Sequence, residues 1–374
     1  MAGIYIHIPF CSQICHYCDF YKTANLKLIH SFVDKIILEI EVRKNFLIED
    51  IDTIYYGGGT PSSLPLSSLS RIHDKLQSTF KFSKDIEITI EVNPDDVSLN
   101  YYNFLKSIGF NRVSIGIQSF NNSILHYLNR KHSSEKARQS ILLAYESGIT
   151  NISCDLIYGI QIQTITDFKY DLGIIKELNI NHLSAYHLGI EEGTYFGKLL
   201  KNNKLKEISE EKSEDFFNFL SNWSETNGYE HYEISNFATS SHYSKHNTNY
   251  WFGKPYLGLG PSAHSFDGAN RFFNISNLNK YLLLSANELL HPEIDLLTLK
   301  DRFNEFILLR LRTKWGISLN EIERQFSKYY SQHVMRIFPK FEESNYLRTE
   351  NSIIYLTKKG FFASDFVVRE LFIT

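Results

Sequence analysis

The fold is decided near the start of the chain, in Ile4-Tyr5-Ile6-His7-Ile8-Pro9-Phe10-Cys11-Ser12-Gln13-Ile14-Cys15-His16-Tyr17-Cys18. The β-branched and aromatic run at Ile4–Ile8 predicts a strand, and a loop with three cysteines follows it directly. Three thiolates can hold three corners of a cubane iron–sulfur cluster, which normally takes four cysteine ligands. Because the loop supplies no fourth cysteine, such a cluster would keep one iron open for a substrate or cofactor.

Two other interpretations of these cysteines remain open. They could be buried small residues, or three ligands of a zinc site that His16 or His7 completes. Zinc sites tend to pair their ligands as C-x2-C from two separate places, and this chain has no second pair. The remaining cysteine, Cys154, lies in an apolar run and is predicted to belong to the core.

Composition excludes several classes of protein. The chain has 374 residues, 43% hydrophobic and 22% charged, with a net charge of −3, so it shows no basic excess that would favour nucleic-acid binding. No run approaches the ~18 apolar residues of a membrane span, and the N-terminus lacks the features of a signal peptide. Free clustered thiols need a reducing compartment. We therefore expect a cytoplasmic protein with no membrane span and no nucleic-acid partner.

Short strand-like runs alternate with helical patterns over the first half of the chain, which favours a parallel α/β sheet. Six such units predict an incomplete (βα)6 barrel or a doubly wound sheet, and either fold binds ligands at the carboxyl ends of its strands. The expected strands are Ile4–Ile8, Thr53–Tyr56, Ile86–Val92, Arg112–Ile117, Asn151–Leu156 and His182–Tyr186. The expected helices include Leu26–Phe46, Ser67–Phe80, Ser133–Ser147 and Ile165–Leu178.

Three regions are predicted along the chain. Residues 1–190 would form the partial barrel, and residues 191–290 an extension of it with a Gly-, Pro- and aromatic-rich tract. Residues 291–374 would form a small winged-helix-like α+β domain, with helices at Phe303–Arg312 and Leu319–Tyr330 and a hairpin at Tyr346–Leu356.

Polar residues and glycines follow the predicted strands and would therefore share the edge of the sheet that carries the cysteines. Taken singly, each is more often a turn, capping or surface residue. Together they suit a cofactor with an amine, a carboxylate and a ribose. The set is Gly58, Gly59 and Thr60 after the second strand, Glu91 at the third, Gln118 at the fourth, Arg130, and Asp155 at the fifth.

The C-x3-C-x2-C loop, with Gly57-Gly58-Gly59-Thr60-Pro61 after the second strand, resembles the radical S-adenosylmethionine (SAM) superfamily. The segments Tyr5–Cys11, Glu91–Pro94, Ser114–Phe120 and Asp155–Gly159 resemble, more closely, the oxygen-independent coproporphyrinogen oxidase group. The resemblance implies a [4Fe–4S] cluster on Cys11, Cys15 and Cys18, with SAM on the open iron. It also implies a SAM pocket in which Gly58, Gly59 and Thr60 meet the amino-acid end, Arg130 pairs with the carboxylate, Glu91, Gln118 and Asp155 line the rest, and Tyr5 and Gly189 are neighbours.

Two features select a branch of that group. Oxidases of the group carry a fourth cysteine two residues after the third, where this chain has Phe20; instead it has His246-Asn247-Thr248-Asn249-Tyr250-Trp251, the H-N-x-x-Y-W motif of the HemW branch. Gln161 and Asn129 are minor departures from the group's usual Pro and Gly. The resemblance implies a heme chaperone with an unidentified acceptor protein and a cluster reductant.

Three functions remain as alternatives at this stage. The first is the heme chaperone, the second a coproporphyrinogen III oxidase that decarboxylates its substrate, and the third a zinc-stabilised scaffold without catalysis. Imidazole is a common axial ligand of heme, so His246 is a candidate ligand, although a histidine among aromatics is more often a packing residue. The alternative ligands are His242, His264 and His231.

Overall fold

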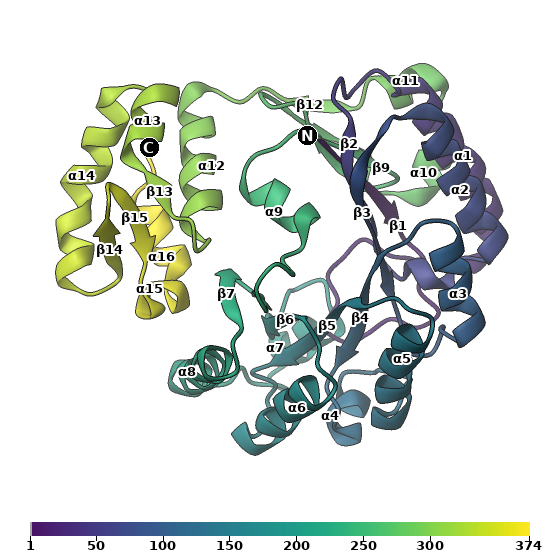
Figure 1. Cartoon of the computed structure of the whole chain (residues 1–374), viewed down its shortest axis with the longest axis horizontal. Helices are drawn as coiled ribbons and strands as arrows, with labels where there is room; N and C mark the ends of the chain where they lie inside the picture. Colours follow the sequence, from purple (N-terminus) through teal and green to yellow (C-terminus); the bar gives the residue numbers. More distant parts are fainter. Residues whose placement is uncertain (1) are drawn as a thin grey trace.

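The computed structural model describes residues 2–374 and centres on a twelve-stranded sheet (Figure 1). Its first six strands are parallel and lie side by side in chain order, as predicted. They are β1 (Ala2–Ile8), β2 (Ile51–Gly58), β3 (Phe82–Val92), β4 (Arg112–Gln118), β5 (Asn151–Tyr158) and β6 (His182–His187).

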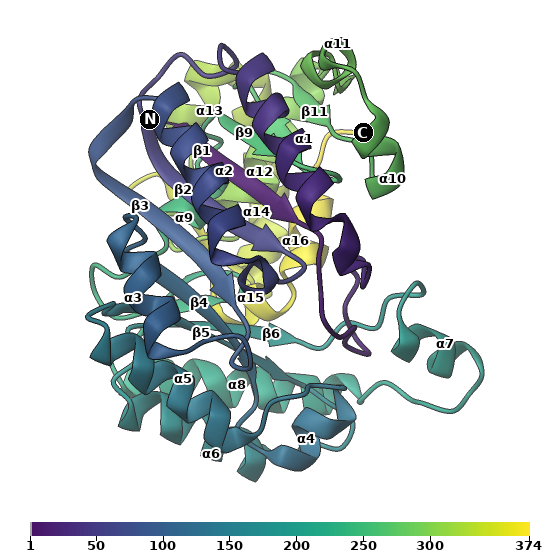
Figure 2. The same ribbon diagram turned by 90° about the vertical axis from the view of Figure 1, so that its right-hand side faces the viewer.

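Helices cover the outer face of these strands (Figures 1 and 2). They are α1 (Ile29–Val42), α2 (Leu66–Thr79), α3 (Leu99–Ser107), α4 (Asn122–Tyr127), α5 (Ser134–Glu146) and α6 (Ile165–Glu177). The largest core forms between the two layers, where the strands' alternate aliphatic residues are fully buried against the apolar stripe of each helix. Cys154 on β5 is among these buried residues, as predicted.

The sheet does not close into a barrel, which confirms the incomplete (βα)6 prediction. Beyond β1 it continues with β9 (Tyr256–Leu259), β10 (His264–Phe266), β11 (Arg271–Phe273) and β12 (Glu293–Asp295), and beyond β6 with β8 (Asn236–Ala238) and β7 (Glu230–Glu233). The aromatic-rich tract thus supplies edge strands at both ends of the sheet. Apart from α9, the remaining α-helices before the C-terminal module are α7 (Tyr195–Lys201), α8 (Glu210–Thr226), α10 (Leu278–Leu283) and α11 (Ala286–Leu290).

Helix α9 (Lys245–Trp251) carries the H-N-x-x-Y-W motif and packs on the sheet, in contact with β1 and β2. The carboxylate of Glu87 on β3 accepts hydrogen bonds from the first two backbone amides of α9, Lys245 N (3.1 Å) and His246 N (3.0 Å). These amides have no partner within the helix, so Glu87 fixes its start. Figure 1 shows α9 between the parallel sheet and the C-terminal module.

The C-terminal module has its own core, which includes Phe303, Ile307 and Val334. It contains α12 (Leu299–Leu311), β13 (Ile317–Ser318), α13 (Leu319–Gln325), α14 (Lys328–Glu343), β14 (Leu347–Glu350), β15 (Ile353–Leu356), α15 (Lys358–Phe362) and α16 (Ser364–Glu370). The predicted hairpin is present as β14–β15, with β13 added at its edge. This helix-and-hairpin composition fits the predicted winged-helix-like α+β module.

One predicted helix is wrong in its extent. The expected Leu319–Tyr330 helix ends at Gln325, because Ser327 has a φ of 123° that no right-handed helix accommodates. A second helix then begins at Lys328 and runs through Pro339 to Glu343. Within residues 2–374, no helix combines the length and the apolarity needed to cross a membrane.

Candidate functional site

A cavity of about 450 Å³ opens at the carboxyl ends of the parallel strands. All three clustered cysteines line it, as do most of the residues predicted to surround a cofactor. These are Cys11, Cys15 and Cys18 together with Gly58, Gly59, Thr60, Glu91, Gln118, Arg130, Asp155 and Gly189. Phe20 occupies the position at which the oxidases of the resembled group carry a fourth cysteine. It also lines the cavity and is 69% exposed.

The cysteine loop leaves the end of β1 and is closed by backbone hydrogen bonds. Thr23 N donates to Pro9 O (2.7 Å) and Cys11 N donates to Thr23 O (3.0 Å). Cys11 is buried while Cys15 and Cys18 are half-buried. Burial raises the pKa of the Cys11 thiol to about 11, against a lowering by the Thr60 hydroxyl, and burial also raises the pKa of Cys18. The loop is therefore held in place by its backbone and keeps its sulfurs toward the cavity.

Two side chains from other loops donate to the sulfurs. Thr60 Oγ1 lies 3.4 Å from Cys11 Sγ, and Arg130 Nη1 lies 3.4 Å from Cys15 Sγ. The Thr60 hydroxyl lowers the pKa of Cys11 and so opposes the larger effect of burial. Within residues 2–374, no three His, Cys, Asp or Glu side chains converge on the position of a single metal ion. In a cubane, each cysteine binds a different iron.

The glycines after β2 allow this loop to approach the cysteines. A Cβ on Gly59 would lie 2.8 Å from Phe10 O and 3.0 Å from Cys11 Sγ. Gly58 has a φ of 113°, and a Cβ there would lie 2.8 Å from the ring of His7. Neither position accepts a side chain without displacing the cysteine loop or its neighbour.

Two half-buried carboxylates lie on β3 and β5. Glu91 accepts hydrogen bonds from Tyr55 Oη (2.9 Å) and Gly58 N (3.2 Å), and Asp155 accepts from Ser114 Oγ (3.1 Å). Burial raises the pKa of Glu91 to about 7, and the charge of Asp155 adds to the effect. Burial likewise raises the pKa of Asp155. The pair favours a ligand that offers hydrogen-bond donors.

Arg130 is the only arginine among the described residues that line this cavity, and it has an unused donor. Its Nη2 donates to Gly116 O (2.7 Å) and Asn93 Oδ1 (3.0 Å), whereas its buried Nε has no hydrogen-bond partner within residues 2–374. A guanidinium with a free donor suits a carboxylate. Gln118 ends β4 with a φ of 67°, which turns the chain away from the strand at the cavity wall.

Tyr5 and His246 do not line this cavity. The Tyr5 ring stacks on Tyr55, and its hydroxyl bonds His7 Nδ1 (3.1 Å). The ring of His246 is also stacked on Tyr55. It is 2% exposed, with Nδ1 bonded to Thr53 Oγ1 (2.8 Å) and Nε2 to Tyr250 Oη (2.8 Å). Burial lowers the pKa of His246 to about 3.

The other histidines considered as ligands differ in how they are engaged. His231 is stacked on Phe237 and bonds Ile234 O, and His242 bonds Thr239 and Ser240. His264 is exposed and packs edge-on against Phe273. His7 and His16, the candidate completions of a zinc site, bond Tyr21 O and Tyr127 O, respectively.

The cavity lining includes residues that sequence reasoning did not assign to the site, among them Tyr17, Gly116 and Tyr186. Tyr17 lies inside the cysteine loop and Tyr186 lies near the end of β6, so their positions in the sequence could have indicated them. Gly116 could not have been found in this way, because it lies within β4 and matters through its carbonyl, which accepts from Arg130.

Comparison with known proteins agrees with this geometry. The family model of the radical SAM superfamily matches residues 5–175, and that of the HemN C-terminal domain matches residues 297–363. In solved structures, the chain is similar to coproporphyrinogen III oxidase (HemN) from Escherichia coli, with a TM-score of 0.84 and 25% identity over 99% of this chain and 88% of that one.

Curated relatives match over nearly the whole length. The heme chaperone HemW of Lactococcus lactis subsp. lactis (strain IL1403) is 33% identical over 362 residues, which is 96% of this chain and 93% of that protein. The heme chaperone HemW of Bacillus subtilis (strain 168) is 32% identical over 96% of both chains. With the cysteine loop, the glycine loop and the H-N-x-x-Y-W helix in place, this extent of identity shows that the chain belongs to the HemW family of radical SAM proteins.

Proposed function

We propose that this protein is a heme chaperone that binds heme and transfers it to an acceptor protein, and that it carries a [4Fe–4S] cluster with an exchangeable SAM. The observation that carries the proposal is the near full-length identity to relatives named heme chaperones. Phe20 in place of a fourth cysteine, together with the H-N-x-x-Y-W helix, supports this branch over the oxidase.

The residues around the cavity fit a cluster with one open corner. Cys11, Cys15 and Cys18 would hold three irons, while Thr60 and Arg130 already donate to two of the sulfurs. The fourth iron would take the amino and carboxylate groups of SAM. The free Nε of Arg130 is available to a carboxylate, and the half-buried carboxylates of Glu91 and Asp155 are available to donors. A bound cluster supplies electrons, which a reductant outside this chain would provide.

His246 remains the predicted heme ligand, and its surroundings define what ligation requires. Both ring nitrogens are already hydrogen-bonded inside the protein. Coordination of iron would replace the bond from Nε2 to Tyr250 or the bond from Nδ1 to Thr53. Tyr250 lies on the same helix as His246, whereas Thr53 lies on β2, and the imidazole is 2% exposed. Heme binding through His246 therefore needs one of these two bonds to break and the side chains that cover the ring to move.

Anaerobic reconstitution with iron and sulfide, then EPR with and without SAM and a hemin titration, tests the proposal. We expect a cluster signal that shifts with SAM and saturable hemin binding. The absence of saturable hemin binding by the wild-type protein would reject the chaperone. Release of 5′-deoxyadenosine in step with product from coproporphyrinogen III would establish the oxidase instead, which the likeness to HemN keeps as the second candidate. Zinc without labile sulfide would establish the scaffold.

A further inference from the structure

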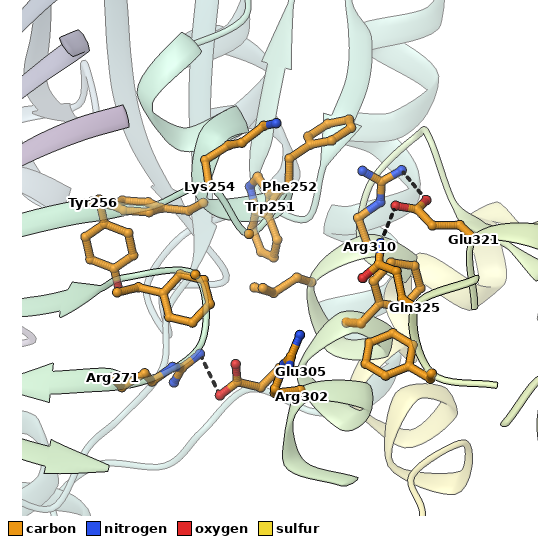
Figure 3. A pocket seen from close by; sticks show the side chains of 17 residues that line it. Trp251, Phe252, Lys254, Tyr256, Arg271, Arg302, Glu305, Arg310, Glu321 and Gln325 are labelled. Atoms are coloured by element: carbon orange, nitrogen blue, oxygen red, sulfur yellow. Dashed lines mark hydrogen bonds and ion pairs between the residues drawn. The ribbon is translucent and has the colours of Figure 1, made fainter. Parts of the chain in front are cut away.

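A second cavity, of about 390 Å³, lies between α9 and its following loop on one side and the C-terminal module on the other (Figure 3). Trp251, Phe252, Lys254 and Tyr256 line it from the first side, and Arg302, Glu305 and Arg310 from α12 line the second. It shares no lining residue with the cysteine cavity. Its size falls within the range of about 300–1,000 Å³ that is typical of small-molecule sites.

The walls of this cavity are aromatic. Trp251 and Phe252 close the H-N-x-x-Y-W helix, and Phe252 is 36% exposed. Phe306 and Phe326 face them from the C-terminal module. Exposed aromatic faces that converge on one space mark a site for a flat apolar ligand.

The charge of the cavity indicates that its ligand is also anionic. Four cationic side chains, Lys254, Arg271, Arg302 and Arg310, line it against only two carboxylates, Glu305 and Glu321, which leaves a net charge of +2. Arg271 pairs with Glu305 at 3.0 Å, and Arg310 lies 3.9 Å from Glu321. Lys254 and Arg302 have no side-chain hydrogen bond or ion pair within residues 2–374.

Arg310 is the most constrained of these cations. Its guanidinium lies 4.0 Å from the centre of the Phe252 ring, and its side chain is 13% exposed. Its buried Nε has no hydrogen-bond partner in the described chain. A donor of this kind next to an aromatic wall suits a carboxylate attached to a flat ring.

We infer that this second cavity is the heme site, in which the aromatic walls hold the porphyrin and the unpaired cations bind its two propionates. The inference rests on the proposed function and adds the place of binding to it. The net charge of +2 matches a dicarboxylate, and both sides of the cavity contribute aromatic and cationic residues. No histidine among the described residues lines the cavity, but Tyr250, whose hydroxyl bonds His246 Nε2, does. The cavity residues would therefore recognise the porphyrin ring and its propionates, and ligation of the iron by His246 is a separate step.

The test compares hemin binding by two double variants of equal charge. Lys254→Gln with Arg302→Gln removes the two unpaired cations of the cavity. Lys280→Gln with Lys300→Gln removes two exposed cations outside it. Both pairs lower the net charge by two, so non-specific attraction to an anion changes equally. We expect the dissociation constant for hemin to rise about tenfold in the cavity variant, given two interactions of the usual surface strength, and to stay within twofold in the control.

Two further probes separate ring recognition from iron ligation. Iron-free protoporphyrin IX should compete with hemin, whereas its dimethyl ester, which has lost both charges, should compete far less. Equal hemin affinities in the two double variants, with saturable wild-type binding, would overturn the inference and leave the proposed function standing. Failure of protoporphyrin IX to compete would also overturn it. Failure of the wild type to bind hemin would overturn both.

Discussion

Gly59 is where the glycine loop touches the cysteine loop most closely. In Gly59→Ala, the new Cβ would meet the backbone at Phe10 O (2.8 Å) and Pro9 C (2.9 Å), so the cysteine loop must shift. We expect this variant to lose most of its capacity for iron and labile sulfide after anaerobic reconstitution. Gly173→Ala, at an exposed helical site with nothing within 4 Å of the new Cβ, is the control and should load normally. Full loading of Gly59→Ala would contradict the prediction.

Tyr250 determines whether His246 is free to bind iron. Its hydroxyl lies 2.8 Å from His246 Nε2, so Tyr250→Phe removes one of the two bonds that engage the imidazole. If His246 is the heme ligand, this variant should bind hemin several-fold more tightly, because the competing bond is gone, and His246→Ala should bind it weakly. The ferric Soret band of each variant reports the ligation. Unchanged spectra in both variants would remove His246 from the set of ligands.

Helix α1 is tied to the edge strands through a buried ion pair. Glu39 lies 3.4 Å from Arg43 and accepts hydrogen bonds from Gly260 N and the Tyr281 hydroxyl, and both charged side chains are at most 1% exposed. Glu39→Ala leaves the Arg43 charge buried without its partner, so we expect a loss of about 3–5 kcal/mol in the free energy of unfolding. Glu41→Ala, at an exposed pair on the same helix, should leave the urea midpoint almost unchanged. Equal effects would contradict the prediction.

Asp171 joins α6 to the turn after β4 and gives the fold a pH dependence. It accepts hydrogen bonds from Phe120 N (2.7 Å) and Ser119 Oγ (2.8 Å), and burial raises its pKa from 3.8 to about 7. Between these values Asp171 binds more protons in the folded state than in the unfolded state. Its contribution to the free energy of unfolding is therefore fully present below pH 3.8 and is lost as the pH rises to about 7. Urea midpoints between pH 5 and pH 8 should fall less in Asp171→Asn than in the wild type. Parallel curves would contradict this.

The elements that could be predicted from sequence are those whose local pattern agrees with their final surroundings. Strands β1–β6 are apolar runs in the sequence because helices cover and bury them, so the local pattern predicts them. Strands β7–β12 have only three or four residues each and form by pairing with distant partners, so no local pattern indicates them. No glycine or proline marks the break at Ser327, and Pro339 argued against the helix that contains it.

The cavity at the strand ends was predictable for the same reason, since parallel strands bring their carboxyl ends to one edge. The contacts inside it were not. The bond from Tyr55 to Glu91 depends on the register between β2 and β3, in which Tyr55 pairs with Thr89, two residues before Glu91. The burial of His246 depends on where α9 docks, which its seven residues do not encode.

Over the whole molecule, the C-terminal module meets the sheet domain through polar contacts and through aromatic pairs such as Phe217–Phe362 and Phe252–Trp315. Lys314 bonds Glu230 and Tyr243, its backbone amide donates to Tyr232 O, and Arg271 pairs with Glu305. Partly exposed ion pairs of this kind contribute little to stability, and such interfaces allow relative movement of the two parts. A ligand that fills the second cavity would therefore restrain the module as well as occupy the site.

Hydrogen exchange measures this restraint directly. Hemin that contacts both walls should slow amide exchange in Lys245–Trp251 and Leu299–Leu311 together, because opening either wall would then require its release. Exchange in α3 (Leu99–Ser107), on the outer face of the sheet, should not change and serves as the internal control. Protection confined to the loops around Cys11–Cys18 would place heme at the cysteine cavity instead. Protection of α9 without α12 would leave the C-terminal module outside the site and contradict a ligand held between the two.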